Sequence, residues 1–202
     1  KILDLGTGNA VIPLVLSLRT KASIYGVDIQ PDIIEMANKS IEYNNLQSQV
    51  KLEACDMKSL LLRKNEYNTY DLILSNPPYF SNLELSTKND DIHKTIARHE
   101  VMIKLNDIIN VASKLLKEGG TFALIHRTDR LVEIINCMQE YNIEPKLIKF
   151  VYKNMNSCSE MFYIEGIKNG SKGLKIAKPF VLYEVDGTKT FDYEQLCKEV
   201  YL

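Results

Sequence analysis

The tetrapeptide Asn76-Pro77-Pro78-Tyr79 directly follows the apolar run 70–75. Two consecutive prolines can neither continue a strand ladder nor enter a helix interior, so the backbone must leave the strand as a stiff corner. Such a corner fixes an amide, which donates and accepts hydrogen bonds, beside an aromatic ring that can stack. An ordinary proline-rich loop is the plainer interpretation, and it has to be weighed against the rest of the chain.

A glycine turn lies near the start of the chain, at Gly6-Thr7-Gly8, between an apolar run and an apolar helical stretch. Glycines there let the backbone turn tightly and approach a ligand, with the amides of the next helix pointing at it. A dinucleotide fingerprint needs a third glycine where Val11 stands, and the Gly-Lys-Ser/Thr of a P-loop is absent. The turn therefore suits a ligand other than a pyrophosphate, unless it is purely structural.

Three carboxylates are expected at or near the carboxyl ends of strands. Asp28, 20 residues after Gly8, is placed to accept hydrogen bonds from both ribose hydroxyls, or to cap a helix. Asp56 is placed to accept from an adenine amino group, with Met57 adding its N–H and an apolar cover, or it is a turn residue. Asp4 is expected beside a cationic part of the ligand, or bonded to loop amides. Together they predict a pocket for an adenosine that carries positive charge and no phosphate.

Strands and helices are expected to alternate along the chain, and a long loop, rich in polar residues, is expected at 81–97. This order predicts an α/β fold with a doubly wound, mostly parallel sheet that binds ligands at the carboxyl ends of its strands. A hairpin of the last two strands adds an antiparallel edge. The expected strands are 1–5, 23–28, 50–54, 70–75, 121–125, 146–152 and 160–167; the expected helices begin near 11 and 31 and span 101–116, before Gly119-Gly120, and 130–141.

Composition indicates one substantial core, because 45% of the 202 residues are hydrophobic and 25% are charged. The formal charge of −1 gives no overall attraction to polyanions, so nucleic-acid binding would need a local basic patch. Residues 145–180 supply one, with seven lysines against two glutamates, although a solvated surface explains any single lysine equally well. The lysines are Lys146, Lys149, Lys153, Lys168, Lys172, Lys175 and Lys178.

Four scattered cysteines and three histidines predict reduced thiols, a cytosolic protein and no metal site. We expect neither a membrane span nor a signal peptide, since no apolar run approaches 18 residues. The chain begins inside an expected buried strand, so we expect further residues ahead of Lys1 in the natural protein.

These motifs resemble the class I, Rossmann-like S-adenosylmethionine-dependent methyltransferases that carry an Asn-Pro-Pro-Tyr motif. The string from Asp4 to Pro13, the ending Pro-Pro-Tyr-Phe80 and the string Ala97-Arg98-His99-Glu100 are most similar to bacterial tRNA(Val) adenine-N6 methyltransferases. The chain departs from that pattern at Ala10, where glycine is expected. The resemblance implies a seven-stranded methyltransferase domain over 1–168, with 169–202 as a C-terminal extension packed on it.

The resemblance also implies S-adenosylmethionine as the cofactor. It implies RNA, with the anticodon loop of a tRNA as the expected target, as the partner that binds through the lysine-rich patch. Asn76 and the Pro77 carbonyl would accept hydrogen bonds from the adenine N6 amine and aim its lone pair at the methyl group, while Tyr79 stacks on the base. The implied catalytic residues are Asn76, Pro77, Pro78 and Tyr79. The implied cofactor-binding residues are Asp4, Gly6, Thr7, Gly8, Asp28, Ile29, Asp56, Met57 and Asn76.

Other functions fit parts of the same pattern. Enzymes that methylate a glutamine amide of translation release factors share the Asn-Pro-Pro-Tyr chemistry, but usually carry an upstream helical domain. DNA adenine methylation would call for a sizeable target-recognition domain, which is not evident in the sequence. A catalytically silent RNA-binding module is the alternative from another class, and it would bind no cofactor.

Overall fold

The computed structural model of the chain describes residues 1–78 and 105–200. Its strands form one sheet in the order β3-β2-β1-β4-β5-β7-β6-β8, with β9 also paired to β6. The long strands are β1 (Ile2–Leu5), β2 (Ile24–Asp28), β3 (Val50–Ala54), β4 (Tyr70–Ser75), β5 (Leu116–Arg127), β6 (Ile143–Tyr152) and β7 (Ser159–Lys168). The short strands are β8 (Lys175–Ile176) and β9 (Phe180–Val181).

The sheet is mostly parallel, as the alternation of strands and helices predicted. Strands β1 to β5 pair in parallel, whereas β7 is antiparallel to both β5 and β6. The expected C-terminal hairpin is therefore confirmed, and β8 and β9 extend the seven expected strands. The order reverses between β1 and β4, which makes the carboxyl ends of these two strands the topological switch point.

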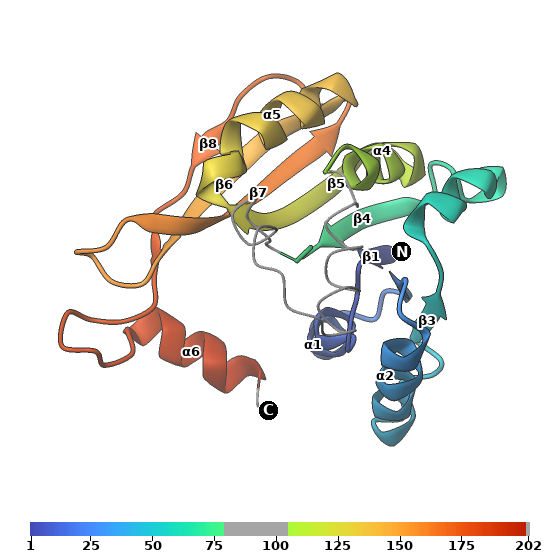
Figure 1. Cartoon of the computed structure of the whole chain (residues 1–202), viewed down its shortest axis with the longest axis horizontal. Helices are drawn as coiled ribbons and strands as arrows, with labels where there is room; N and C mark the ends of the chain where they lie inside the picture. Colours follow the sequence, from blue (N-terminus) through green and yellow to red (C-terminus); the bar gives the residue numbers. More distant parts are fainter. Residues whose placement is uncertain (79–104, 201–202) are drawn as a thin grey trace, which may run out of the picture.

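Helices cover both faces of the sheet, with α4 and α5 on one face and α1 and α2 on the other (Figure 1). The helices are α1 (Val11–Arg19), α2 (Pro31–Tyr43), α4 (Leu105–Leu115), α5 (Leu131–Glu140) and α6 (Phe191–Val200), with the 3-10 turns η1 (Met57–Leu62), η2 (Lys64–Glu66) and η4 (Thr128–Arg130). Within the described ranges, no helix is long and apolar enough to cross a membrane.

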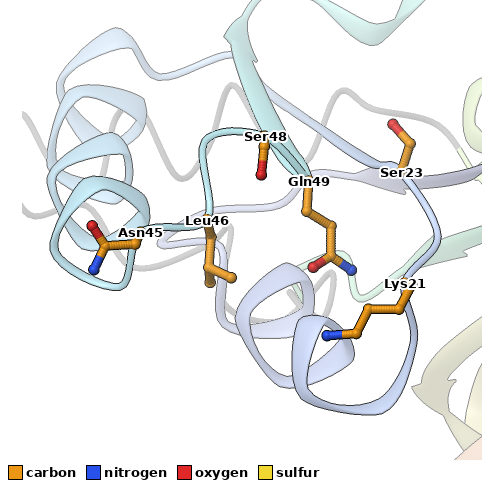
Figure 2. Close-up of a pocket in the computed structure, with 6 residues that line it drawn as sticks. All are labelled: Lys21, Ser23, Asn45, Leu46, Ser48 and Gln49. Atoms are coloured by element: carbon orange, nitrogen blue, oxygen red, sulfur yellow. The ribbon is translucent and has the colours of Figure 1, made fainter.

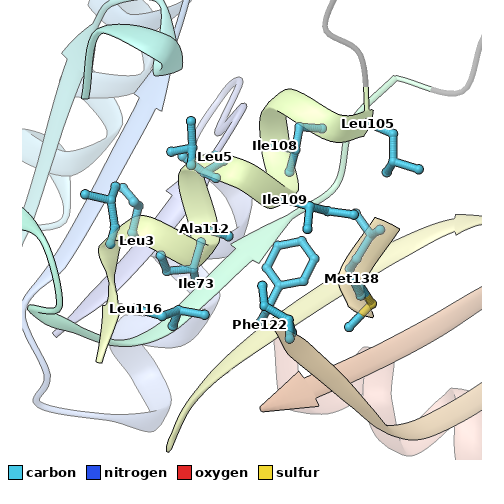
Figure 3. Packing of buried hydrophobic residues seen from close by; sticks show 14 of the residues in the cluster. Leu3, Leu5, Ile73, Leu105, Ile108, Ile109, Ala112, Leu116, Phe122 and Met138 are labelled. Atoms are coloured by element: carbon cyan, nitrogen blue, oxygen red, sulfur yellow. The ribbon is translucent and has the colours of Figure 1, made fainter. Parts of the chain in front are cut away.

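The larger core lies under α4 and α5. Figure 3 shows Phe122 of β5 among Ile73 of β4, Ile109 of α4 and Met138 of α5, and Phe122 itself is fully buried. Burying an apolar side chain of this size stabilises a fold by about 1.5–3 kcal/mol. The core therefore holds β4 and β5 firmly, and β4 leads directly into the diproline corner at one edge of the sheet.

Helix α4 passes into β5 through a bulge. The predicted helix end near Leu116 is confirmed to within one residue, but β5 begins there, earlier than the expected start at residue 121. The register shifts between Tyr70 and Leu72 of β4, and Gly119 in the bulge has a φ of 73°. The N–H groups of residues 68 and 69 bond to the carbonyls of residues 114 and 115, which ends the helix by tertiary pairing.

Lys168 is a correction to the expected basic patch. Its side chain is 9% exposed, and Nζ donates to Asn68 Oδ1 at 2.7 Å and to the Leu116 carbonyl at 2.9 Å. Burial lowers its pKa. A lysine held in this way ties β7 to the segment before β4 and to the first residue of β5, so it is not a surface contact for a polyanion.

The segment after β7 runs along the outer side of β6. Strand β8 pairs with Leu147–Ile148, near the middle of β6, and β9 pairs with Val151–Tyr152, at its carboxyl end. Tyr193 of α6 packs against Phe180 and Tyr183 in edge-to-face contacts. The chain after β9 therefore leaves the sheet at the edge where β1, β4 and β5 also end.

Candidate functional site

The carboxyl ends of the central strands bring the predicted motifs together. Leu5 pairs with both Val27 and Ser75, and Asp28 pairs with Ala54. The residues that follow these pairs are therefore neighbours at one edge of the sheet. They form a pocket lined by Gly6, Val27, Asp28, Ile29, Cys55, Asp56, Met57 and Pro78. Val27 and Cys55 were not predicted, since an apolar strand residue and a lone cysteine carry no chemical signal in the sequence.

The glycine turn is built as expected. Gly6 and Gly8 have φ values of 76° and 52°, and a β-carbon placed on either would have no heavy atom within 4 Å. The N–H groups of Gly6 and Thr7 both donate to the Val27 carbonyl at 2.9 Å. Glycine is thus required here by conformation, and it leaves open space beside the backbone for a ligand.

Ala10, where the family pattern expects glycine, precedes α1 with a φ of 58° and is fully buried. The left-handed conformation costs an alanine roughly 1–2 kcal/mol. Glycine would adopt this conformation without that cost, which explains why the family pattern has glycine here. Helix α1 forms with alanine nevertheless.

Asp28 joins the end of β2 to the glycine turn. Its Oδ2 accepts from the Gly8 N–H at 2.8 Å, and its Oδ1 accepts from the Gln30 N–H at 3.0 Å. The residue is 8% exposed. Oδ1 also accepts a long hydrogen bond, at 3.5 Å, from the Gln30 side-chain amide. Oδ2 therefore keeps a lone pair for a ligand hydroxyl, and a second hydroxyl would have to replace the Gln30 amide at Oδ1.

Asp4 lies almost completely buried, 1% exposed, in β1 beneath the turn. Its Oδ2 accepts from the Thr7 hydroxyl at 2.7 Å. Among the described residues, its Oδ1 is the one buried side-chain nitrogen or oxygen without a hydrogen-bond partner. Burial raises the pKa of Asp4 from 3.8 to about 6; the bond from Thr7 opposes this rise, and the Asp28 carboxylate adds to it.

Asp56 and Met57 close the pocket from the β3 side. Asp56 is exposed and caps η1, since its Oδ1 accepts from the Lys58 N–H at 2.9 Å. Met57 is buried and lines the pocket next to it. Asp56 is therefore a turn residue, the plainer of the two roles that the sequence allowed, and it also lines the pocket with Met57.

The diproline corner stands beside the glycine turn. Pro78 lines the same pocket as Gly6, and exposed Asn76 follows Ser75 at the end of β4. The Ser75 hydroxyl donates to the Leu5 carbonyl at 2.8 Å, a bond that fixes the end of β4 to β1 and was not predicted. Tyr79, like the motif at 97–100 and the expected loop at 81–97, lies outside the described residues.

An ion pair closes the segment that carries Asp56 and Met57. Arg63, at the end of η1, makes two hydrogen bonds to Glu53 of β3 and one, at 3.2 Å, to the Tyr25 hydroxyl. Tyr25 also donates to Glu53. The hydrogen bonds from Arg63 and Tyr25 lower the pKa of Glu53 to about 2. The pair thus fixes both ends of the stretch 54–62 against β2 and β3.

We expect Arg63→Gln to lower the free energy of unfolding at pH 7 by about 1 kcal/mol, since the pair is partly exposed and screened. A depressed Glu53 pKa stabilises the fold above the ordinary value of 4.5, and this contribution is lost as the pH falls toward 2. The difference in free energy of unfolding between Arg63→Gln and the unsubstituted protein, measured by urea titration, should therefore decrease as the pH falls from 4.5 toward 2. The control Lys64→Gln changes the adjacent, exposed residue and should have the stability of the unsubstituted protein. A stability loss in Arg63→Gln that did not depend on pH would contradict the role given to the Arg63–Glu53 pair.

A second pocket lies at the opposite edge of the sheet. Figure 2 shows Ser23 and Gln49, which precede β2 and β3, with Lys21 and Asn45 beside them. Gln49 Nε2 donates to the carbonyls of Thr20 and Ala22, so its amide serves the fold. No predicted site residue lies in this pocket. Within the described ranges, no group of three or more His, Cys, Asp or Glu is placed to hold a metal ion.

Comparison with known proteins gives one family match, to the methyltransferase domain, over residues 1–178. A tRNA1(Val) (adenine(37)-N6)-methyltransferase of Parabacteroides distasonis is 30% identical over 145 residues, which is 72% of this chain and 59% of the relative. A protein of the same name from Cytophaga hutchinsonii is 23% identical over 202 residues, covering 100% and 82%. One from Porphyromonas gingivalis is 34% identical over 134 residues, covering 65% and 51%. The chain thus spans between half and three fifths of the first and third relatives.

Solved structures share the fold. A predicted O-methyltransferase from Agrobacterium tumefaciens superposes with a TM-score of 0.77 at 18% identity, covering 98% of this chain and 88% of that protein. Geranyl diphosphate C-methyltransferase from Streptomyces coelicolor, solved with S-adenosyl-L-homocysteine, gives a TM-score of 0.58 at 13% identity, covering 83% and 70%. At these identities the likeness concerns the fold alone.

Proposed function

Because this chain belongs to the methyltransferase domain family, we propose that it is an S-adenosylmethionine-dependent N-methyltransferase acting on the exocyclic N6 amine of an adenine in RNA. The observation that carries the proposal is the pocket itself, in which Pro78 of the diproline corner meets the glycine turn and Asp28. The names of the relatives support tRNA as the substrate class, and we propose the anticodon loop as the target region.

The described residues fit the cofactor. Open space beside Gly6 and Gly8 admits a ligand against the backbone. Oδ2 of Asp28 has a lone pair left for one ribose hydroxyl, and a second hydroxyl could replace the 3.5 Å bond from the Gln30 amide at Oδ1. Asp4 Oδ1 is a buried acceptor that no protein group satisfies. A cationic ligand would compensate the cost of burying it. Asp56 and Met57 would hold the adenine, with Ile29 as a further apolar wall.

The cofactor, when bound, supplies a methyl group activated by a sulfonium. The chain contributes geometry: the Asn76 side-chain oxygen and the Pro77 carbonyl would each accept a hydrogen bond from the adenine amine. These bonds pull the nitrogen toward a tetrahedral shape and aim its lone pair. The proton then has acceptors at hand, so a strong general base is not required. We propose that Tyr79 stacks on the adenine base.

The activity test uses radiolabelled S-adenosylmethionine with total tRNA, rRNA and a release factor in separate reactions. We expect label in tRNA, and nucleoside digestion should recover it as N6-methyladenosine. Label that enters only the release factor would replace the proposal with glutamine methylation. Cofactor that fails to bind in calorimetry would indicate a silent RNA-binding module instead.

We propose that exposed lysines on the β6–β8–β9 side contact the RNA backbone. Lys153 follows β6 at the edge where the pocket lies, and Lys175 and Lys178 lie on the adjoining segment. Three strand spacings, about 14 Å, separate β4 from β6. A loop whose adenine reaches Asn76 could therefore place a neighbouring phosphate near these lysines.

We expect the triple variant Lys153→Gln, Lys175→Gln, Lys178→Gln to weaken tRNA binding and to reduce the slope of log affinity against log salt by about 2, since each lost phosphate contact removes roughly 0.7–0.9. Filter binding at several salt concentrations measures both quantities. The control triple Lys21→Gln, Lys51→Gln, Lys64→Gln removes the same charge at exposed positions on the other side of the sheet. Equal effects of the two triples would show that only net charge matters.

A further inference from the structure

Within residues 1–78 and 105–200, Asp4 Oδ1 is the one buried side-chain nitrogen or oxygen that has no hydrogen-bond partner. Its side chain lies on the same sheet face as Thr7, and the strand neighbours facing it, Gly26 and Leu74, carry no titratable group. Arg19, the one charged residue of α1, is in the last turn of that helix, remote from the glycine turn. Asp28 of β2 is therefore the charged neighbour that acts on Asp4.

The carboxyl of Asp4 is linked to the pocket through Asp28. Asp28 lines the pocket and its charge is felt by Asp4, so a charge of opposite sign bound beside Asp28 must also act on Asp4. The carboxyl is shielded from bulk solvent, because the residue is 1% exposed, so that interaction is weakly screened. A cation in the pocket therefore favours the carboxylate form, whereas burial and Asp28 favour the acid.

We propose that Asp4 couples cofactor binding to proton release: its buried carboxyl is partly protonated in the ligand-free protein and gives up this fraction of a proton to solvent when the cationic cofactor is bound. The inference rests on the proposed function. The step breaks the O–H bond of the acid, leaves the electron pair on the carboxylate and requires no further reactant. The pH then tunes cofactor affinity, and binding weakens as the solution becomes acidic.

The size of the effect follows from the pKa of about 6. The fraction of Asp4 carboxyls that carry a proton therefore falls as the pH rises from 6 to 7. We expect cofactor binding to release a measurable fraction of a proton at pH 6 and a smaller fraction at pH 7. The Thr7 hydroxyl lowers this pKa, so Thr7→Val should increase the release at pH 7.

Calorimetry at pH 6 in phosphate and in bis-Tris, whose ionisation enthalpies differ, measures the protons released on binding S-adenosylmethionine. Asp4→Asn should abolish the difference between buffers, and the uncharged 5′-methylthioadenosine should show none with the unsubstituted protein. Binding of S-adenosylmethionine with equal heats in both buffers would overturn the proton linkage and leave the proposed function standing. Absence of any binding would instead overturn the proposed function. Should Asp4→Asn fail to fold, the unsubstituted protein and Thr7→Val decide the question by themselves.

Discussion

Asn76→Ala is expected to reduce methyl transfer at least 100-fold, while affinity for S-adenosylmethionine stays within about tenfold, or 1.4 kcal/mol. Removing one hydrogen-bonding group that acts on the reacting centre typically costs 10²–10³ in turnover. The amide would act on the substrate amine rather than on the cofactor. Single-turnover rates with tRNA and calorimetric cofactor titrations separate the two effects.

The fold should tolerate this change, because Asn76 is exposed and follows the last residue of β4. Gln47→Ala is a suitable control, since it removes an exposed amide at the opposite edge of the sheet. Loss of cofactor affinity in parallel with turnover would show that Asn76 shapes the cofactor pocket. Unchanged turnover would show that the Pro77 carbonyl alone orients the amine.

Local patterns predicted the elements that bury apolar runs. Strands β3 and β4 have the bounds expected from the sequence, since each is a short run with high strand propensity bounded by turn residues. The Gly119 bulge behaves differently. The sequence placed Gly119-Gly120 between a helix and the next strand, whereas in the structure both glycines lie inside β5, at the bulge. The pairing with β4 that starts β5 at Leu116 depends on residues distant in the sequence, so this early start could not be read locally.

In the site, too, some features had a local sequence signal and others depended on tertiary contacts. The spacing between Gly8 and Asp28 indicated a shared site, and the two residues are joined by a direct hydrogen bond. The bond from Ser75 to Leu5 spans 70 residues and had no local signal. Lys168 was expected at the surface because lysine usually is, whereas its partner Asn68 lies 100 residues away in the sequence. Patterns of residue type thus find the chemistry, while burial of polar groups depends on tertiary contacts.

Asp28→Ala is expected to weaken cofactor affinity at least 100-fold and to lower the free energy of unfolding by about 3 kcal/mol or more. Each hydrogen bond to a charged group contributes about 1.5–3 kcal/mol, and the change leaves the N–H groups of Gly8 and Gln30 without their acceptor. Urea titration measures the loss of stability. Calorimetric titration with S-adenosylmethionine, at a temperature at which the variant is folded, measures the loss of affinity.

Asp28→Asn separates the two roles of this side chain. Its single oxygen can keep the bond to Gly8 or to Gln30 but not both, because the amide NH2 group cannot accept. We therefore expect an intermediate loss of stability, with cofactor affinity still strongly reduced as one ribose acceptor disappears. Asp32→Ala, an exposed position in the first turn of α2, should leave both quantities unchanged. If Asp28→Ala lost stability yet bound S-adenosylmethionine normally, the carboxylate would serve to hold the glycine turn against β2, and the ribose would have to be bound elsewhere in the pocket.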